Sequence, residues 1–370
     1  MNVSRLALCA CFLLVLGSAI FGQQQYYAVT GGSSTEGIFL SVIDVNAQVL
    51  VGRLSVPQPI GGVALTSDGL IAYGTLYGTP TVVANGLVIA DITDPTAPVQ
   101  IAIIQDICGQ EGPGSNGPAA VALTKDDAFA YIACLGSPLG TPGKWVVKFD
   151  TATQQATRID MSAPTGMANP GPFGVFAHPN EAEMWITIYG HGVNPQGTKI
   201  VRINIADDTI LGTIDVGASP TGGAFCSDQT YGYFSVNNRN PIGTNRILKI
   251  GADGVVQGGG IQVPVGTVGI AFNSDCSLAY AGGFGNLTFQ KDRVITIDTA
   301  TGAVSSFTIP PATSGPFNVL VTSDDFYLIV GMFGSLTRPG TDVRIYQRDT
   351  LELLGIVEVG QAPSGIAVTP

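Results

Sequence analysis

The sequence PAAVALTKDDAFAYI, residues Pro118–Ile132, contains the pattern that the whole chain repeats. A proline is followed by a short apolar run, a polar turn with an Asp, and a second apolar run that ends near a Tyr. Equivalents of the Pro118 position, called starts below, are Ile60, Pro118, Pro172, Pro220, Thr267, Pro316 and Pro363. Their spacings of 58, 54, 48, 47, 49 and 47 residues are typical of propellers and solenoids, whose repeats span roughly 40–50 residues.

Each repeat consists of four short segments with the character of β-strands. In the fifth repeat they are GIAF (269–272), SLAYAGGF (277–284), RVITIDT (293–299) and VSSFTI (304–309). Their apolar alternation and β-branched residues favour strands, and Gly, Pro, Asn or Asp occupies the junctions. Four antiparallel strands repeated around an axis form the blades of a β-propeller. The 49 Gly, 23 Pro and 12% charged residues also favour many short strands over helical layers.

The two ends of the chain decide the number of blades. The last repeat, PSGIAVTP, stops before the turn of the pattern, and the segment QQQYYAVTGG that begins at residue 23 supplies the missing part. Tyr27 and Gly32 are expected to lie thirteen and eighteen residues into this shared repeat. Such closure hides the edges of an open sheet. We therefore predict a single all-β, seven-bladed propeller over residues 23–370, with one blade built from Gly365–Val368, Tyr26–Thr30, Ile38–Val45 and Val49–Val56.

Fixed positions within the repeat predict turns and packing. Eight residues after the starts lie Asp68, Asp126, Asn180, Asp228, Asp275 and Asp324. Asp and Asn side chains accept hydrogen bonds from the backbone two residues on, so these residues are expected to be structural. Thirteen residues after the starts lie Tyr73, Tyr131, Trp185, Tyr233, Tyr280 and Ile329, which we expect to fill the space between adjacent sheets. Eighteen residues after the starts lie Gly78, Gly136, Gly190, Asn238, Gly285 and Gly334, which favour positive φ.

Residues 1–22 have the features of a secretory signal peptide. Arg5 gives the positive n-region, Leu6–Leu16 the apolar h-region, and small residues follow. We favour cleavage after Gly22 over cleavage after Ala19, and we favour both over a membrane anchor because the apolar run is short. No later apolar run approaches the ~18 residues of a membrane helix. The mature chain is therefore expected to have no membrane span and to be secreted, periplasmic or at the cell surface.

Removal of the signal peptide leaves four cysteines. An even number of cysteines in an oxidising compartment permits disulfides. Repeat position favours the pairs Cys108–Cys134 and Cys226–Cys276, each in a shared or neighbouring blade. Buried free thiols acting as small hydrophobic side chains are the alternative.

The charge of the chain bears on its partners. The net charge is −11, and 16 Lys and Arg are scattered over 370 residues. A nucleic-acid-binding protein normally presents a basic patch or stripe, so we expect no nucleic-acid partner.

Loop lengths distinguish the two faces of the predicted ring. The loops between second and third strands are long, and insertions at residues 105–117 and 160–171 separate successive blades. Both loop classes emerge on the same face, here called the long-loop face, whereas the opposite, short-turn face carries short turns. Binding residues concentrate on loops that a rigid scaffold carries. The long-loop face is therefore the candidate functional face, with loops at Leu76–Asn85, Leu135–Gly143, Gly190–Gly197, Asn237–Thr244, Gly285–Lys291 and Gly334–Gly340.

The sequence from Val294 to Gly331, VITIDTATGAVSSFTIP…GPFNVLVTSDDFYLIVG, resembles the YVTN-type β-propeller repeat. In that family an Ile-Asp-Thr strand end precedes a Pro-Gly-Val-Ala-x-x-x-Asp-Gly turn. Similar segments are Val42–Asp44, Lys148–Thr151 and Pro363–Val368, and the resemblance covers residues 23–370. It implies the scaffold, since its relatives include surface or periplasmic proteins, lactonases and redox-enzyme domains. Function must be argued from the site.

Few residues carry obvious chemistry. His178 ends an inner strand on the short-turn face, where a structural role is expected, and no CxxCH haem signature or GxSxG nucleophile elbow occurs. Two distant histidines do not supply the several convergent ligands of a haem or zinc site. The aromatic residues Tyr77, Tyr189, Phe284 and Phe333 could surround a sugar or peptide, although packing between blades is favoured. The predicted ligand-binding residues of the long-loop face are Glu111, His191, Asn194, Asn237, Asn238, Arg239 and Arg338.

These residues leave three interpretations of the function. The favoured interpretation is a non-catalytic binding or interaction module without a cofactor, which takes a protein or glycan on its long-loop face. The alternative is a metal-dependent lactonase or lyase with its site at the axis. Its calcium or magnesium would need oxygen ligands, for which Glu111, Asn194, Asn237, Asn238 and Asp292 are candidates. A structural component of a cell-surface layer is the third interpretation.

Overall fold

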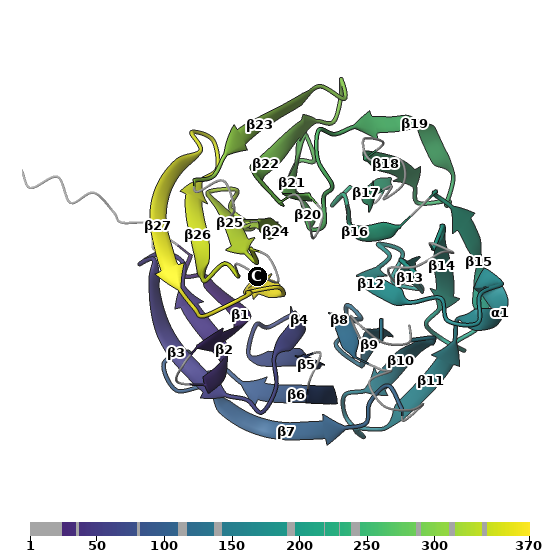
Figure 1. Ribbon diagram of the computed structural model, residues 1–370, viewed down its shortest axis with the longest axis horizontal. Helices are drawn as coiled ribbons and strands as arrows, with labels where there is room; N and C mark the ends of the chain where they lie inside the picture. The colour runs from purple at the N-terminus through teal and green to yellow at the C-terminus, as the bar shows by residue number, and fades with distance from the viewer. Residues whose placement is uncertain are drawn as a thin grey trace, which may run out of the picture.

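The described residues of this computed structural model are 24–34, 37–79, 82–109, 117–136, 143–190, 197–217, 219–228, 230–237, 245–285, 290–310, 315–334 and 339–370. They form seven four-stranded antiparallel sheets arranged around a central axis (Figure 1). This confirms the predicted all-β, seven-bladed propeller.

The blades are numbered here in chain order, beginning with the blade that contains both chain ends. Blade 1 contains β28 (Ile366–Val368), β1 (Tyr27–Ser34), β2 (Gly37–Asp44) and β3 (Val49–Ser55). Blade 2 contains β4 (Ile60–Leu65), β5 (Ile71–Thr79), β6 (Val82–Asp91) and β7 (Val99–Gln105). Blade 3 contains β8 (Pro118–Leu123), β9 (Phe129–Cys134), β10 (Trp145–Asp150) and β11 (Ala156–Asp160). Blade 4 contains β12 (Pro172–Ala177), β13 (Glu183–Ile188), β14 (Lys199–Asn204) and β15 (Ile210–Asp215).

The remaining blades repeat the same order from the axis outward. Blade 5 contains β16 (Pro220–Phe225), β17 (Tyr231–Val236), β18 (Arg246–Gly251) and β19 (Val256–Gln262). Blade 6 contains β20 (Ile270–Phe272), β21 (Leu278–Gly285), β22 (Gln290–Asp298) and β23 (Val304–Thr308). Blade 7 contains β24 (Pro316–Val321), β25 (Tyr327–Met332), β26 (Asp342–Gln347) and β27 (Glu352–Glu358). A single-turn helix, α1 (Ser162–Thr165), lies in the insertion at 160–171.

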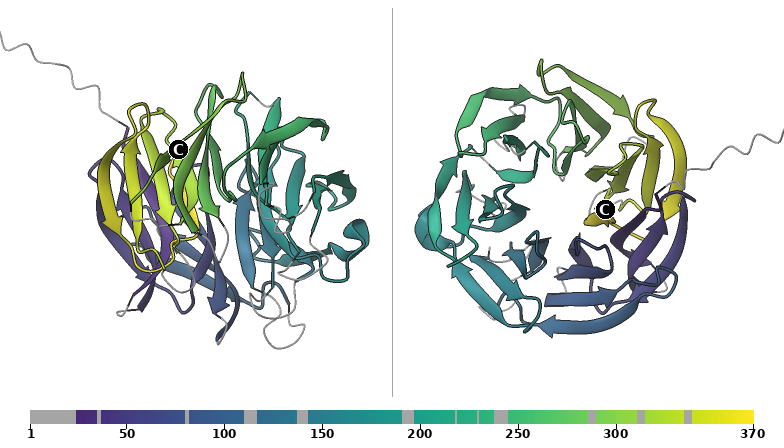
Figure 2. Two further views of the ribbon diagram at one scale, coloured as in Figure 1. Left: turned by 45° about the horizontal axis from the view of Figure 1, so that its top comes forward. Right: turned by 180° about the vertical axis from the view of Figure 1, so that it is seen from behind.

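The core lies between neighbouring sheets. The second strands are almost fully buried, whereas outer strands such as β11 and β23 are largely exposed. The residues thirteen positions after the starts are buried, as predicted, and Tyr131 and Trp185 are among the largest fully buried side chains. Such side chains pack between neighbouring sheets, and the blades follow one another around the axis (Figure 2).

Closure of the ring joins the two ends of the chain. β1 pairs with β28 through Ala28 opposite Val368 and Thr30 opposite Ile366, which confirms the predicted shared blade. Val29 lies opposite Ala367, as Tyr73 lies opposite Ala64 in blade 2. The position thirteen residues into this repeat is therefore Val29, and the assignment to Tyr27 was wrong by two residues. The side-chain period of a strand is two, so this shift leaves the buried face unchanged.

The Asp and Asn turns form as predicted. Asp68 Oδ1 accepts a hydrogen bond from Leu70 N at 3.0 Å, and Asn180 Oδ1 accepts one from Ala182 N at 2.9 Å. The corresponding bonds are made by Asp126, Asp228, Asp275 and Asp324. Each of these side chains satisfies a backbone donor at the start of a second strand, which defines the short-turn face.

The predicted glycine position behaves in two ways. Gly136, Gly190 and Gly334 have positive φ angles of 98°, 66° and 71°. Gly78 and Gly285 instead lie in strands, opposite Val83 and Gln290. Blades 2 and 6 have longer second and third strands, so parts of two predicted loops are hairpin extensions. Asn238 lies outside the described residues.

Adjacent blades are joined on the short-turn face by a recurring contact. Ser67 N and Oγ donate to Asp127 Oδ2 in the next blade at 2.8 and 2.6 Å. Ser274 makes the same contact with Asp325, at 2.8 and 2.6 Å. Each acceptor lies nine residues after its start and has positive φ, 57° for Asp127 and 61° for Asp325. We call this contact the junction clasp.

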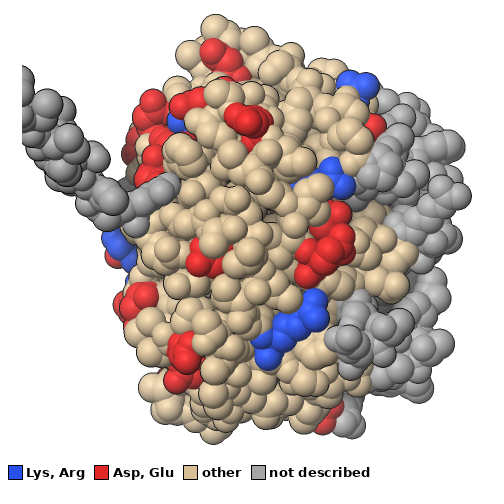
Figure 3. Space-filling view, turned by 90° about the vertical axis from the view of Figure 1, so that its left-hand side faces the viewer, with Lys and Arg blue, Asp and Glu red and all other residues tan. Residues whose placement is uncertain are grey.

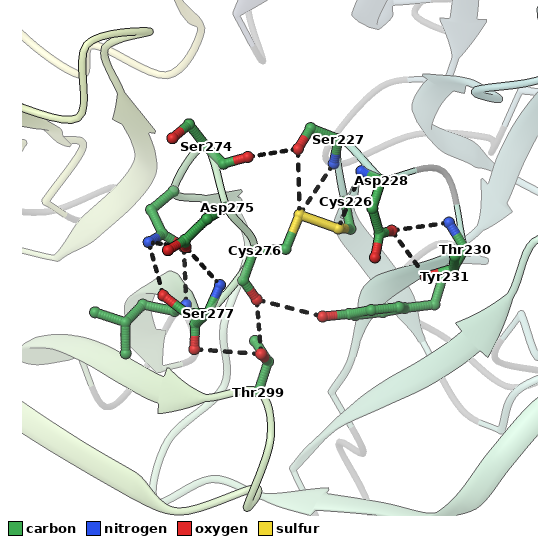
Figure 4. The surroundings of a disulfide bond; sticks show 12 residues. Cys226, Ser227, Asp228, Thr230, Tyr231, Ser274, Asp275, Cys276, Ser277 and Thr299 are labelled. Carbon is green, nitrogen blue, oxygen red and sulfur yellow. Dashed lines mark hydrogen bonds between the residues drawn. A yellow bond between two sulfur atoms is a disulfide. The ribbon is translucent and has the colours of Figure 1, made fainter.

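The junction between blades 5 and 6 replaces the carboxylate with a disulfide (Figure 4). Cys276 occupies the clasp position, with φ 60°, and is bonded to Cys226. Ser227 still donates from its backbone N to Cys276 Sγ, at 3.1 Å. The second disulfide, Cys108–Cys134, ties the connection after β7 to β9 of blade 3. Both pairings that repeat position favoured are therefore present, and all four cysteines are buried.

Charge is distributed unevenly between the two faces. Short turns carry most of the 27 carboxylates of the chain, among them Asp44, Asp68, Asp91, Asp94, Asp126, Asp127, Asp150, Asp207, Asp208, Asp228, Asp253, Asp275, Asp298, Asp324, Asp325 and Asp349. By contrast, the outer wall around β27 and β3 is mainly uncharged, with charged side chains in small separate groups (Figure 3). Among the described residues, no helix has the length and apolar character needed to cross a bilayer.

Candidate binding surface at the long-loop mouth

The inner strands line the axis, so the first residues of these strands surround its mouth on the long-loop face (Figure 1). The residue after each start lies at this mouth. These residues are Gly61, Ala119, Phe173, Thr221, Val268, Phe317 and Ser364. The mouth therefore combines small, polar and aromatic side chains that come from all seven blades.

Aromatic side chains form two groups at this mouth. In blade 4 the rings of Phe173 and Tyr189 have centroids 5.4 Å apart. In blade 7 the rings of Phe317 and Phe333 lie 5.1 Å apart, and Phe284 of blade 6 packs edge-on against both, at 5.2 and 5.7 Å. Phe284 is buried, whereas the other four are half-buried. Packing was the expected role of these aromatic residues, and Phe284 serves it, but half-buried rings also keep part of their surface open.

Tyr77 occupies the corresponding position in blade 2. A Cβ atom added to Gly117, which precedes β8, would lie 2.9 Å from the Tyr77 ring. The ring therefore packs on the bare backbone that leads into blade 3, where only glycine fits. Burial raises the pKa of the Tyr77 phenol well above its ordinary value, so this hydroxyl stays protonated over the physiological range and acts in packing.

Polar residues at the mouth between blades 5 and 6 bond to one another. Asn237 Nδ2 donates to Thr221 Oγ1 at 3.0 Å and to Thr267 O at 2.6 Å. Asn237 Oδ1 accepts the backbone N–H of Thr267 at 3.0 Å, and Thr221 Oγ1 donates to Thr267 O at 3.0 Å. All of the side-chain polar atoms of Asn237 are thus engaged in joining two blades.

A similar link joins blade 7 to blades 1 and 2. Asn318 Nδ2 donates to the backbone oxygen of Ser364. Ser364 Oγ lies 2.9 Å from Ile60 O and 2.8 Å from Gly61 O, to which it donates. Buried polar groups need such partners, and these links close the ring at the mouth.

The predicted site residues are placed as follows. Asn237 lies at the mouth, held by the bonds described above. Glu111, His191, Asn194, Asn238, Arg239 and Arg338 lie outside the described residues. Asp292 precedes the buried part of β22, and its backbone oxygen accepts the N–H of Ile309 at 2.5 Å.

His178 lies on the opposite face and has a structural environment. Its Nδ1 accepts the N–H of Asn180 at 3.1 Å, and its Nε2 lies 3.1 Å from Ala252 O. The ring stacks on Trp185, with centroids 5.1 Å apart. Both ring nitrogens are therefore occupied, which agrees with the expected structural role.

Metal ligands converge at one place in the described chain. Cys226, Asp228 and Cys276 have ligand atoms within 4.8 Å of one another. The two sulfur atoms are joined in the disulfide of Figure 4. This group therefore belongs to the junction between blades 5 and 6.

Sequence reasoning missed Phe173, Phe317, Thr221, Thr267, Asn318 and Ser364 as residues of the mouth. The available signal was their place at the starts or within two residues of them, because the first residues of inner strands must lie together. The strands contain a β-bulge directly after several starts, for example between Pro172 and Val175. Such a bulge re-aims the neighbouring side chains, and the sequence pattern does not show it.

Comparisons with known proteins agree with the fold. The chain matches no protein-family model and no curated protein. Among solved structures it is similar to a putative 6-phosphogluconolactonase from Bacteroides fragilis, with a TM-score of 0.68 and 14% identity over 94% of this chain and 98% of that chain. It is also similar to the periplasmic gluconolactonase of Pseudomonas aeruginosa, with a TM-score of 0.67 and 15% identity over 94% and 99%. It is similar as well to a protein of unknown function from Desulfotomaculum acetoxidans, with a TM-score of 0.66 and 16% identity over 94% of this chain and 99% of that chain. At these identities the similarity shows the fold alone.

Proposed function

We propose that this chain is an exported, non-catalytic binding module that takes a glycan on its long-loop mouth. The observation that carries the proposal is the pair of half-buried aromatic groups, Phe173 with Tyr189 and Phe317 with Phe333. An aromatic side chain offers a large apolar surface at a fixed geometry, which suits the C–H face of a sugar ring. A protein ligand that inserts an apolar side chain is the alternative occupant of the same surface.

The rigidity of the mouth supports this proposal. The hydrogen bonds of Asn237, Thr221 and Ser364 fix the inner strands at the surface that carries the aromatic rings. A pre-organised surface loses little conformational freedom when a ligand binds, which favours affinity.

The export of the protein is part of the same proposal. The predicted signal peptide at residues 1–22 and the two disulfides support it, because structural disulfides form and persist in oxidising compartments. We also infer that the repeat is of the YVTN type. The geometry of the Asp turns, which repeats from blade to blade, and the strand ends at Asp44 and Asp150 support this inference.

Binding of the 23–370 protein to panels of glycans and peptides tests the proposal. For a ligand found in this way, Phe317→Ala is expected to weaken binding roughly tenfold, since an aromatic contact contributes about 0.5–1.5 kcal/mol beyond its buried area. Phe326→Ala removes a ring that is 39% exposed on the short-turn side of blade 7 and serves as the matched control. Failure of every panel member to bind, or equal losses in both variants, would contradict the proposal.

The alternative proposal is a metal-dependent lactonase or lyase, favoured by structural neighbours whose names include gluconolactonase. Calcium or magnesium would need several oxygen ligands at the axis. The side-chain oxygen of Asn237 already accepts the Thr267 N–H, which leaves one lone pair of that oxygen for a cation. The alternative also needs further oxygen ligands, for which the predicted candidates are Glu111, Asn194, Asn238 and Asp292.

Thermal unfolding with calcium or magnesium, compared with excess chelator, separates the two functions. A metal that binds only the folded state adds about 2.7 kcal/mol of stability at a hundredfold excess over its Kd. Such a shift, together with hydrolysis of a sugar lactone, would favour the enzyme. An unchanged melting temperature with glycan or peptide binding would favour the binding module.

A further inference from the structure

A cavity of about 310 Å³ opens on the short-turn face, opposite the aromatic mouth. Residues of blades 3, 4 and 5 line it, principally Lys125, His178, Pro179, Glu181, Ile205 and Phe225. Its volume is at the lower end of the range for small-molecule sites, roughly 300–1,000 Å³. This volume is sufficient for a small ligand.

The rim of this cavity carries one cation and one anion. Lys125 Nζ and the Glu181 carboxylate form an ion pair between blades 3 and 4 at the position of the junction clasp. Their side chains are 71% and 51% exposed. Exposed ion pairs contribute only about 0–1 kcal/mol. A ligand with both charges can thus replace this pair at little cost, with its anionic group on Lys125 and its cationic group on Glu181.

The walls of the cavity are mainly apolar. The Phe225 ring packs edge-on against His178 and Trp185, with centroids 4.9 and 5.0 Å away. Pro179 and Ile205 add apolar surface. The nitrogens of His178 are occupied by Asn180 N and Ala252 O, so this ring contributes packing surface to the cavity.

Lys125 supplies the positive charge that an anionic group would contact at this place. The other cations of blades 3 and 4, Lys148 and Arg202, are paired with Asp208 and Glu183. Lys148 Nζ donates to Ile205 O in the cavity wall at 2.6 Å and pairs with Asp208 at 3.0 Å. The position of Lys125 is occupied by Ser67 in blade 2 and by Ser274 in blade 6, so the turns of those blades offer no such cation.

We propose that this cavity binds a free α-amino acid with an apolar side chain of the size of leucine. The carboxylate contacts Lys125, the ammonium group contacts Glu181, and the side chain lies against Phe225, Pro179 and Ile205. The ligand must therefore carry a carboxylate, an ammonium group and an apolar side chain in one small molecule. The site is separate from the proposed glycan site and does not depend on it.

Isothermal titration of the 23–370 protein with leucine tests this proposal. Leucine is expected to bind, whereas N-acetylleucine and leucine amide, which each lack one charge, should bind at least tenfold more weakly. Glycine and aspartate should fail to compete, because the first lacks the apolar body and the second adds a carboxylate.

Two variants and a matched control make the test specific to this cavity. Lys125→Met and Glu181→Gln change exposed side chains, so both are expected to fold, and each should weaken leucine binding at least tenfold. Asp127→Asn alters the equivalent clasp position between blades 2 and 3 and should leave leucine binding unchanged. Absence of leucine binding to the wild type, or binding unaffected by either charge variant, would overturn the proposal. Phe317→Ala should leave it intact, which separates this site from the mouth.

Discussion

Glu183 shows how a single buried charge is satisfied in the second strand of a blade. The residue is 7% exposed. Arg202 donates to its two oxygens from Nε and Nη2, both at 2.8 Å, and Trp185 Nε1 donates at 3.1 Å. Burial opposes ionisation, but the hydrogen bonds from Arg202 and Trp185 outweigh it and hold the pKa of Glu183 below its ordinary value.

Glu183→Gln is expected to lower the free energy of unfolding by about 2–3 kcal/mol. The substitution leaves the Arg202 guanidinium without its counter-ion, and unpaired buried charges are strongly destabilising. Urea unfolding at neutral pH measures the change. Asp215→Asn, in the exposed pair with Lys199, should change stability by no more than about 0.5 kcal/mol. A loss at Glu183 as small as this would contradict the argument.

Asn237 allows a structural role to be separated from a ligand-binding one. Asn237→Asp removes the two bonds that Nδ2 donates to Thr221 and Thr267 and places a carboxylate beside a carbonyl oxygen. We expect a loss of about 1–3 kcal/mol, as for other unsatisfied buried groups, measured by urea unfolding. Unchanged stability with lost ligand binding would instead show that Asn237 acts mainly on a ligand.

For single residues, the sequence predicts the interactions that form within one turn. The roles of Asp68 and Asn180 follow from a side chain that bonds its own turn, and the structure confirms them. The role of Phe317 depends on Phe333 and on Phe284 from another blade, so no local pattern contains it.

Between elements, the junction clasp shows that different chemistry can join the blades at one position. Asp127, Glu181, Cys276 and Asp325 occupy the same turn position with positive φ of 57–61°. The carboxylates of Asp127, Glu181 and Asp325 accept hydrogen bonds from the preceding blade. Cys276 is instead covalently bonded to Cys226 of the preceding blade. The disulfide pairing could be anticipated from repeat position. The carboxylate clasps could not, because they depend on how one sheet is placed against the next.

Exchange of the disulfide for a clasp tests this equivalence. Thr occupies the position of Cys226 in blades 1, 2, 3 and 7, and Asp occupies that of Cys276 in blades 3 and 7. Cys226→Ser with Cys276→Ser should lower the free energy of unfolding by about 2–4 kcal/mol. Cys226→Thr with Cys276→Asp should recover about 1 kcal/mol, the net contribution of a typical hydrogen bond, as measured by urea unfolding.

The comparison between the two double variants is itself the control, since both lack the disulfide. Equal stability of the double serine variant and the Cys226→Thr, Cys276→Asp variant would show that a carboxylate clasp cannot take the place of the disulfide at this junction. Substitution of Cys108 and Cys134 by serine removes the other disulfide. The free energy of unfolding lost in that way should not be recovered by any substitution at the junction between blades 5 and 6.

For the whole ring, the number of blades was predictable because both ends of one repeat are visible in the sequence. The strand-by-strand pairing of β1 with β28 was predictable to within two residues, and Val29 rather than Tyr27 takes the core position. The error arose because a strand that joins in from the other end of the chain has no turn to fix its register. Six of the seven predicted ligand-binding residues of the long-loop face lie outside the described residues and stay predictions, whereas the seventh, Asn237, joins two blades.

The acidic turns are expected to make the stability of the whole ring depend on pH. Hydrogen bonds from Thr66 and Leu70 lower the pKa of Asp68, and those from Thr124 and Ala128 lower the pKa of Asp126. Ser277 and Thr301 similarly lower the pKa values of Asp275 and Asp298. A carboxyl with a depressed folded pKa adds stability above its unfolded pKa, near 3.9 for Asp, and loses this contribution as the pH falls through the folded pKa.

We therefore expect the melting temperature to stay nearly constant from pH 7 to about 5 and to fall steeply below about pH 4, where these carboxylates become protonated. Circular dichroism melts across this range measure the effect. Asp126→Asn keeps an oxygen that accepts the Ala128 N–H, as Asn180 does in blade 4, so it should be close to wild type at neutral pH. The same variant should lose less stability than wild type on acidification. Loss that begins near pH 6, or a melting temperature unchanged to pH 2.5, would show that the turns do not control acid stability.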